Sequence, residues 1–252
     1  MTEPDFKDVV GWTLPDAQAR LGGLGWQREV RPEMFRSARF DAGSKSLLVT
    51  ADGWQMADGK LCGRYARIQT AAADVATLMI YPTASPDVLP VFACEWVVIG
   101  ARAHVLVLDV ECLGDDNAAR QRARAALAPL FARYAPSLPP VDDPPQWFVD
   151  IREDWALLTS GDLACLSVAR QAFQDYLEMT ARALYEPWLA TARAGDDHPV
   201  VRAYKEHHAA HSPAPALLSA KAGEQWTRTF LHTWHFGPVQ PTTASQGNES
   251  SN

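Results

Sequence analysis

The chain has 252 residues, of which 47% are hydrophobic, enough for one large core or two small ones. Its formal net charge of −7 argues against a nucleic-acid-binding protein, because such proteins are usually basic. No run approaches the roughly 20 apolar residues that span a bilayer, and the polar N-terminus does not resemble a signal peptide. We therefore expect a cytoplasmic protein without a membrane segment. Four cysteines without metal-binding spacing indicate reduced, buried thiols: Cys62, Cys94, Cys112 and Cys165.

The first predicted element is a helix that begins at Thr13, with Thr13 as its N-cap and Pro15 in its first turn. Gly22 and the glycines that follow it end this helix. Residues 27–44 are polar and arginine-rich, without a clear period. This part of the chain therefore predicts one helix and then an irregular connection.

A series of strands follows. Residues 45–50 predict a strand, and a loop with Asp52-Gly53 and Asp58-Gly59 would close a hairpin onto 61–70. Three apolar runs come next, separated by turn residues and too close together for a crossover helix: 75–81, 88–99 and 104–110. Strands joined this tightly pair antiparallel, so the middle of the chain predicts a meander.

The second half of the chain turns helical. Residues 117–134 predict a helix that Pro129 bends or divides, and the proline-rich run 136–145 predicts a surface loop. Residues 151–159 predict a strand. Ser160-Gly161-Asp162 would then cap a long helix that Glu186-Pro187 ends.

Two more helical segments close the sequence, at 199–211 and at 216–235 with an interruption near Gly223. The polar residues 237–252 predict a disordered tail, and residues 1–236 a single domain. Strands in the middle with helices before and after them indicate an α+β protein. We expect a three-layer α/β/α sandwich with a central antiparallel sheet.

Glu95 stands inside the apolar run 91–99. An ionised, unpaired carboxylate in the interior costs several kcal/mol, so such a group faces a cavity or takes a raised pKa. Glu95 is therefore the first candidate for acid chemistry. The alternative is a strand residue at a bulge or a sheet edge, paired with Arg64 or Arg67.

Three sets of short motifs occur in order between residues 64 and 237. The first set is Tyr81-Pro82, 89–95 (LPVFACE) and 106–109 (LVLD), and the second is 144–147 (PPQW) leading to Glu186-Pro187. The third set is 212–214 (SPA), 217–218 (LL), 223–226 (GEQW) and Phe236. Together they resemble the ferredoxin-dependent bilin reductases, of which this chain would be a divergent member. The resemblance implies the sandwich fold with an open-chain tetrapyrrole held between the sheet and the C-terminal helices. It implies no bound flavin, metal or nicotinamide, and single electrons from a reduced [2Fe-2S] ferredoxin. The protein then supplies protons to a bilin radical.

The resemblance also assigns proton donors. Glu95 occupies the position of the family's principal Asp, which keeps the carboxyl group and adds one methylene. The C-terminal Asp of several members falls on Ser212, with His211 in place of the adjacent Asn and Pro215 in place of an Arg. The implied catalytic residues are Glu95, His211 and Ser212. Histidine titrates in the useful range, although a histidine at a helix end can simply favour the negative end of its helix.

The same alignment gives candidate substrate-binding residues. Thr77 falls where one branch of the family has His, and Gln69 falls near a position that is Glu in that branch. Pro213 and Leu217 belong to the C-terminal segment that would face the pigment. These four residues would shape the pocket.

Other polar residues have simpler explanations. His207 and His211 are spaced to bind a metal on one helix face, but no third ligand follows at a recognisable spacing, so we expect no metal site. Asp109 closes a predicted strand and is more typical of a turn cap. The arginines of 120–133 can dock an acidic ferredoxin, hold bilin carboxylates or form an ordinary solvated helix face.

The leading hypothesis is ferredoxin-dependent reduction of biliverdin IXα or a similar bilin, by an oxidoreductase acting on CH–CH groups. Glu95 would protonate the ring system, and His211 or a water held by Ser212 would supply a second proton. We expect a monomer with ferredoxin as its protein partner. Two alternatives stay open: a non-catalytic tetrapyrrole-binding protein on the same fold, and a reductase of another linear tetrapyrrole such as a chlorophyll catabolite. The double bond reduced and the number of electrons are not given by the sequence.

Overall fold

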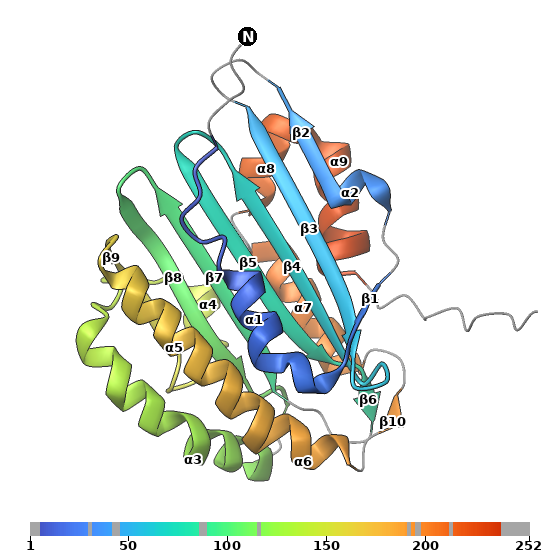
Figure 1. The fold of residues 1–252 in the computed structure, drawn as a ribbon, viewed down its shortest axis with the longest axis vertical. Coiled ribbons are helices and arrows are strands. Elements are labelled where there is room, and N and C mark those ends of the chain that lie inside the picture. The colour runs from blue at the N-terminus through green and yellow to red at the C-terminus, as the bar shows by residue number, and fades with distance from the viewer. Residues whose placement is uncertain are drawn as a thin grey trace, which may run out of the picture.

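One antiparallel sheet runs through the middle of the molecule (Figure 1). The computed structural model describes residues 6–29, 32–41, 46–85, 90–114, 117–190, 193–194, 198–211 and 214–237. Within these residues the sheet has the order β1-β3-β4-β5-β7-β8-β9, and β2 pairs with β3. Its strands are β1 (Trp26–Arg28), β2 (Ser37–Phe40), β3 (Leu47–Met56), β4 (Leu61–Gln69), β5 (Ala73–Pro82), β7 (Val91–Ile99), β8 (Arg102–Glu111) and β9 (Leu157–Asp162).

Helices cover both faces of this sheet, which confirms the predicted α/β/α sandwich (Figure 1). One face carries α1 (Thr13–Leu21), α3 (Asn117–Tyr134) and α5 (Cys165–Met179). The other carries α7 (Pro199–His211), α8 (Ala214–Ala222) and α9 (Glu224–Thr229). The remaining elements are short: α2 (Glu33–Arg36), α4 (Gln146–Val149), α6 (Glu186–Leu189) and a small pair of β6 (Ala84–Ser85) with β10 (Arg193–Ala194). None of the helices in the described ranges has the length and apolar character needed to cross a bilayer.

The sheet has a buried core on each side because side chains alternate between its faces. On β5, Leu78 belongs to the core under α1 and α5, whereas Met79 belongs to the core under α7–α9. We call the face covered by α7–α9 the pocket face. Because both faces are covered, the central strands are almost continuously apolar, which is why the meander was recognisable in the sequence.

The predicted meander is confirmed, and the hairpin before it is longer than expected. β5 pairs with β7 and β7 with β8, all antiparallel. Asp52-Gly53 does not form a loop but lies within β3, opposite Tyr65 and Arg64 of β4. The reversal occurs only at Ala57 and Asp58, whose φ angles of 51° and 56° lie in the left-handed region. Two consecutive positive φ angles are typical of a tight hairpin turn.

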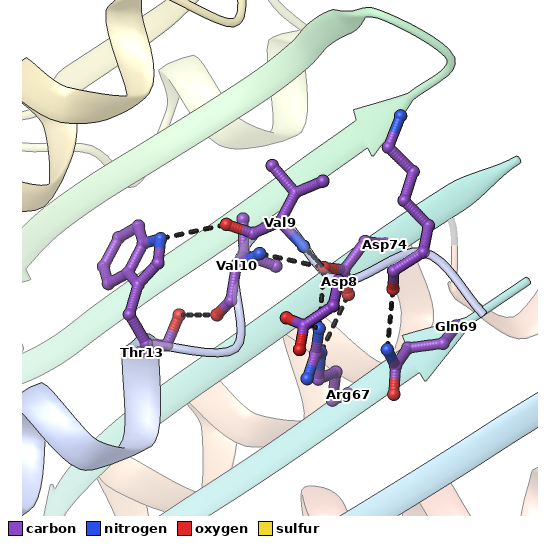
Figure 2. A network of polar contacts seen from close by, with 9 residues as sticks. Asp8, Val9, Val10, Thr13, Arg67, Gln69 and Asp74 are labelled. Carbon is purple, nitrogen blue, oxygen red and sulfur yellow. Dashed lines mark hydrogen bonds and ion pairs between the residues drawn. The ribbon is translucent and has the colours of Figure 1, made fainter. Parts of the chain in front are cut away.

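The segment before α1 is fastened to the sheet by Asp74 (Figure 2). The Asp74 carboxylate accepts the backbone N–H groups of Val9 and Val10 and pairs with Arg67. Thr13 is not an N-cap, because Trp12 precedes it in helical conformation and the Thr13 hydroxyl donates to the Val10 carbonyl at 2.7 Å. Residues 27–44, which showed no period, contain β2 and α2 and part of β1.

The helical half differs from expectation at its boundaries. α3 continues unbroken through Pro129. The predicted strand at 151–159 begins only at Leu157, and Ser160–Asp162 is its end rather than a helix cap. α5 passes into a π-helical turn (Thr180–Tyr185) and then into α6, so Glu186-Pro187 does not end it. Pro187 therefore lies inside a continuous helical run, directly after the π-helical turn.

The last helices are confirmed, with a break at Gly223, whose φ of 84° favours glycine. α9 passes into a second π-helical turn (Phe230–His235). The predicted disordered tail, apart from Gly237, lies outside the described residues, as do Ser212 and Pro213.

Candidate functional site

A cavity of about 230 Å³ lies on the pocket face, between the sheet and the C-terminal helices. Its floor comes from β4, β5, β7, β8 and β9, and its walls from α4, α7, α8 and the second π-helical turn. The lining is mainly apolar with a few polar groups, which is the usual character of a site for a small organic ligand. The polar and aromatic side chains among the lining residues are Thr77, Glu95, Glu111, Trp147, Phe148, His208, His211, Phe230, His235 and Phe236.

Glu95 projects into this cavity from β7. It is half-buried, and its strand neighbours Thr77 and Val107 line the same cavity. Burial raises the pKa of the Glu95 carboxyl, and the nearby His208 only partly offsets that effect. The alternative pairing is wrong, because Arg64 pairs with Glu29 and Arg67 with Asp74 and Asp8. Glu95 is therefore an acid facing a cavity rather than half of an ion pair.

Thr77 and His235 form a polar contact beside Glu95. Thr77 Oγ1 lies 3.3 Å from His235 Nε2. Burial lowers the pKa of His235 to about 3, with the Arg64 charge acting in the same direction, so His235 is neutral at pH 7. Because Thr77 stands opposite Glu95 in the β5–β7 register, this contact borders the acid on one side.

Two buried ionisable residues of the cavity were missed from the sequence, Glu111 and His208. Their Oε2 and Nε2 atoms are 4.0 Å apart, with side chains 2% and 9% exposed. Burial raises the pKa of Glu111 to about 8, and burial lowers the pKa of His208 to about 4. Glu111 falls just beyond the predicted strand 104–110, whereas β8 includes it. One sequence signal pointed to it: Glu111 comes four residues after Val107, so alternation places both side chains on the same strand face. Val107 stands opposite Glu95 in the sheet.

Asp109 lies two residues before Glu111 and is completely buried. Its carboxyl accepts the backbone N–H groups of Val110 and Glu153, at 2.7 and 3.2 Å. Burial, with repulsion from Glu111 as the next contribution, raises the pKa of Asp109 well above its ordinary value. Asp109 lies within β8 rather than closing a strand, but it does hold the backbone of a following segment.

His211 lies at the rim of the cavity. It is exposed, its ring stacks on Trp147 at 6.1 Å, and its Nδ1 lies 2.8 Å from the carbonyl oxygen of His207. Within the described ranges, no third His, Cys, Asp or Glu joins the His207–His211 pair at a spacing that would hold a metal ion. His211 therefore faces both the cavity and solvent.

Other sequence candidates fall away from the cavity. Gln69 faces the opposite side of the sheet, where its side-chain N–H donates to the Lys7 carbonyl at 2.7 Å (Figure 2). Leu217 is 40% exposed, and its neighbour Leu218 lines the cavity instead. Ser212 and Pro213 lie outside the described residues.

The arginines of α3 lie on the opposite face, since α3 packs against α5. They cannot hold a carboxylate of a ligand inside the cavity. Three of them are paired with acidic residues: Arg120 with Glu153, Arg124 with Asp154 and Arg133 with Asp175. Docking of a protein partner on this surface stays a prediction. Cys94 borders the cavity as the strand neighbour of Glu95, but it belongs to the core that contains Trp96, as alternation predicted.

The whole chain is similar in sequence to proteins of one known family. The family model "Ferredoxin-dependent bilin reductase" matches residues 18–237. Phycoerythrobilin:ferredoxin oxidoreductase of Synechococcus sp. (strain WH8020) is 30% identical over 259 residues, covering 92% of this chain and 98% of that protein. The protein of the same name from Synechococcus sp. (strain CC9311) is 29% identical over 245 residues, covering 91% and 95%.

Among solved structures, tomato phytochromobilin synthase in complex with biliverdin has the same fold. The TM-score is 0.66 with 14% sequence identity, and the match covers 90% of this chain and 81% of that chain. At this identity the likeness concerns the fold alone.

Proposed function

Because the chain belongs to the ferredoxin-dependent bilin reductase family, we propose that it reduces a CH–CH double bond of a biliverdin-type linear tetrapyrrole. Reduced ferredoxin supplies the electrons. The observation that carries this proposal is Glu95, a carboxyl of raised pKa in the wall of an apolar cavity, with no ion-pair partner among the described residues. A reductase without its own hydride donor needs a positioned acid, and Glu95 meets that need.

The cavity favours a flat, conjugated and largely apolar ligand. Aliphatic side chains of the sheet form one wall, and Trp147 and Phe230 stand among the groups on the helical side. The described lining contains no Lys or Arg side chain. We therefore place the ring system of the pigment inside and its carboxylates at the open side, near the exposed His211.

Glu95 acts as the first proton donor. Burial raises the pKa of Glu95 and so favours its protonated form, and addition of an electron to the pigment makes a ring carbon or nitrogen basic enough to take a proton. The neutral His235 and the Thr77 hydroxyl border the site without adding charge. His211 at the rim exchanges protons with solvent and resupplies the pocket. A role for Ser212 in holding a water remains part of the proposal.

An anaerobic absorption titration tests this function. Purified protein is mixed with biliverdin, and then with reduced ferredoxin that an NADPH-driven reductase regenerates. We expect the pigment to bind, and its long-wavelength band to be replaced by that of a stable, blue-shifted product. Binding without any spectral change on reduction would instead support the non-catalytic pigment-binding alternative. Product analysis of a positive reaction identifies the double bond.

A further inference from the structure

Glu111 has an environment that the proposed function does not explain. Its side chain is 2% exposed, it lines the same cavity as Glu95, and neither of its oxygens has a hydrogen-bond partner within the described residues. The Tyr204 hydroxyl lies close enough to favour the ionised form of Glu111, but the two groups do not meet in hydrogen-bond geometry. An ionised carboxylate so placed would be costly, whereas a protonated one can remain as a stored acid.

His208 lies between the two acids of the cavity. Its Nε2 is 4.0 Å from Glu111 Oε2, and its charged form also interacts with Glu95. Glu95 stands opposite Val107, and Glu111 is four residues further along β8. At about 3.3 Å per residue, the two acids are roughly 13 Å apart along the strand, too far to share one atom of a ligand. His208 can therefore connect them, or reach a part of the ligand that Glu95 does not.

We propose that Glu111 is the second proton reservoir of the pocket and that His208 passes its proton to the pigment. The inference rests on the proposed bilin reduction and assigns the second proton of that reaction. His208 is the residue that touches the substrate, and Glu111 acts through it. The 4.0 Å separation closes when the pigment binds, or a single water spans it, as in other sites whose proton-transfer contacts tighten in the complex.

Reduction of one double bond takes up two electrons, from two one-electron-reduced ferredoxin molecules, and two protons. Glu95 gives one proton and becomes a carboxylate. The Glu111 carboxyl gives its proton to Nε2 of neutral His208, and the ring releases the proton of its Nδ1 to the second reduced position. Both carboxylates recover protons from solvent after the product leaves, and His208 returns to its starting tautomer when Nδ1 takes up a proton from solvent and Nε2 releases one.

Several groups set the charge around this pair. Asp109 on β8 and Glu153 before β9 repel a negative Glu111, and the Tyr204 hydroxyl of α7 favours it. Besides burial, which lowers the pKa of His208, the Glu95 charge raises that pKa and the charge of the rim residue His211 lowers it. Because Asp109 and Glu111 interact, a pH profile reports the two acids together.

Single-turnover kinetics test the inference. Protein with bound biliverdin is mixed anaerobically with excess reduced ferredoxin, and the loss of pigment absorbance is followed between pH 6 and pH 9 for Glu111→Gln, Glu111→Asp and His208→Gln. His232→Gln, at an exposed position, is the matched control. We expect Glu111→Gln and His208→Gln to slow the reaction at least about 100-fold, the usual contribution of a general acid, with pigment affinity within twofold of wild type.

Two readouts separate this role from a structural one. The wild-type rate should fall above about pH 8, and this fall should be absent in Glu111→Gln. Glu111→Asp, which keeps the acid, should recover most of the rate. Wild-type rates and an unchanged pH profile in both Glu111→Gln and His208→Gln would overturn the inference.

The failure modes are distinguishable. If wild-type protein does not bleach biliverdin at all, the proposed function fails, and this inference with it. If wild-type protein turns over and the variants do so equally fast, only the inference fails. If circular dichroism shows that Glu111→Gln does not fold, the other two variants decide. A near-normal rate in Glu111→Asp together with a slow rate in His208→Gln supports the relay. Wild-type rates in both of these variants overturn it.

Discussion

Arg64 of β4 and Glu29, the residue after β1, form an ion pair with side chains only 1% and 3% exposed. The Arg64 guanidinium also lies 4.6 Å from the centre of the Trp234 ring and donates to the Trp234 carbonyl at 3.2 Å. One buried cation thus joins an N-terminal segment, the sheet and the second π-helical turn. Its attraction to Glu29 offsets the cost of removing its charge from water.

Replacing Glu29 with Gln should lower the free energy of unfolding by about 3–5 kcal/mol, because Arg64 would remain buried without its counter-charge. Urea denaturation at pH 7 measures the change. Asp154→Asn is the control, since the Arg124–Asp154 pair has side chains 58% and 78% exposed and should contribute less than about 1 kcal/mol. Equal losses in the two variants would contradict a special role for the buried pair.

Gly53→Ala should destabilise the protein by about 1–3 kcal/mol through overpacking. A Cβ atom at this position would lie 2.8 and 2.9 Å from two ring carbons of Trp234, and 3.0 Å from Arg64 Nη1. The ring would have to move, which should also weaken pigment binding next to His235. Thermal unfolding and pigment titration measure both effects. Gly22→Ala, where a Cβ meets nothing within 4 Å and φ is −55°, should be neutral or slightly stabilising.

Glu95→Gln keeps the size of the side chain and removes its acid. Pigment affinity should stay within a few-fold, while turnover should fall by roughly 10²- to 10⁴-fold. Steady-state assays with reduced ferredoxin and a separate binding titration distinguish the two effects. Glu95→Asp should retain activity, since Asp keeps a carboxyl acid in the same cavity wall. Normal turnover by Glu95→Gln would exclude this residue as the donor.

Gln69 and Thr77 provide a test of which sheet face binds the pigment. Gln69→Ala removes a hydrogen bond on the opposite face and should cost about 1 kcal/mol of stability without changing the pigment Kd. Thr77→Ala removes a group in the cavity wall and its contact with His235, so it should raise the Kd. The reverse result would place the pigment on the side of α1 and α5.

Glu111 should make the protein less stable as pH rises. Its pKa increases from an ordinary 4.5 to about 8 on folding, so its stabilising contribution is complete below pH 4.5 and is lost as pH approaches 8. The slope from one proton is about 1.4 kcal/mol per pH unit. Glu111→Gln should make this slope shallower in denaturation series between pH 6.5 and 8, and what remains would come from Asp109 and Glu95, whose pKa values burial also raises. That window avoids His208 and His235, whose lowered pKa values remove stability as pH falls below 6.5.

The fold was largely predictable because the central strands are apolar on both faces and lie close together in sequence. β3 was cut short because Asp52-Gly53 has the chemistry of a turn, yet the sheet uses it where Trp234 must approach the backbone. The start of β9 was misplaced because Trp155 packs as a loop residue whose indole N–H donates to the Val110 carbonyl at 3.1 Å. Such tertiary contacts override local preference.

The site was only partly predictable. Glu95 was identifiable because a charge interrupts an apolar strand. Glu111 was not, because it stands at a strand end, where a charged residue is unremarkable. His208 was overshadowed by the i,i+4 spacing of its neighbours His207 and His211. Gln69 was assigned to the cavity by alignment alone, and the alternation of β4 places it on the other face.

The cavity has a further consequence in the order of protein synthesis. Its floor is complete once β9 has been made, but the walls from α7, α8 and the second π-helical turn come from residues 199–236. A nascent chain that still holds these residues in the ribosome exposes Glu95, Glu111 and their apolar neighbours to water. Such a chain can form the sheet but offers no enclosed place for a pigment. We therefore expect the enclosed cavity to form only after the last helices have packed on the sheet, when Arg64 contacts Trp234.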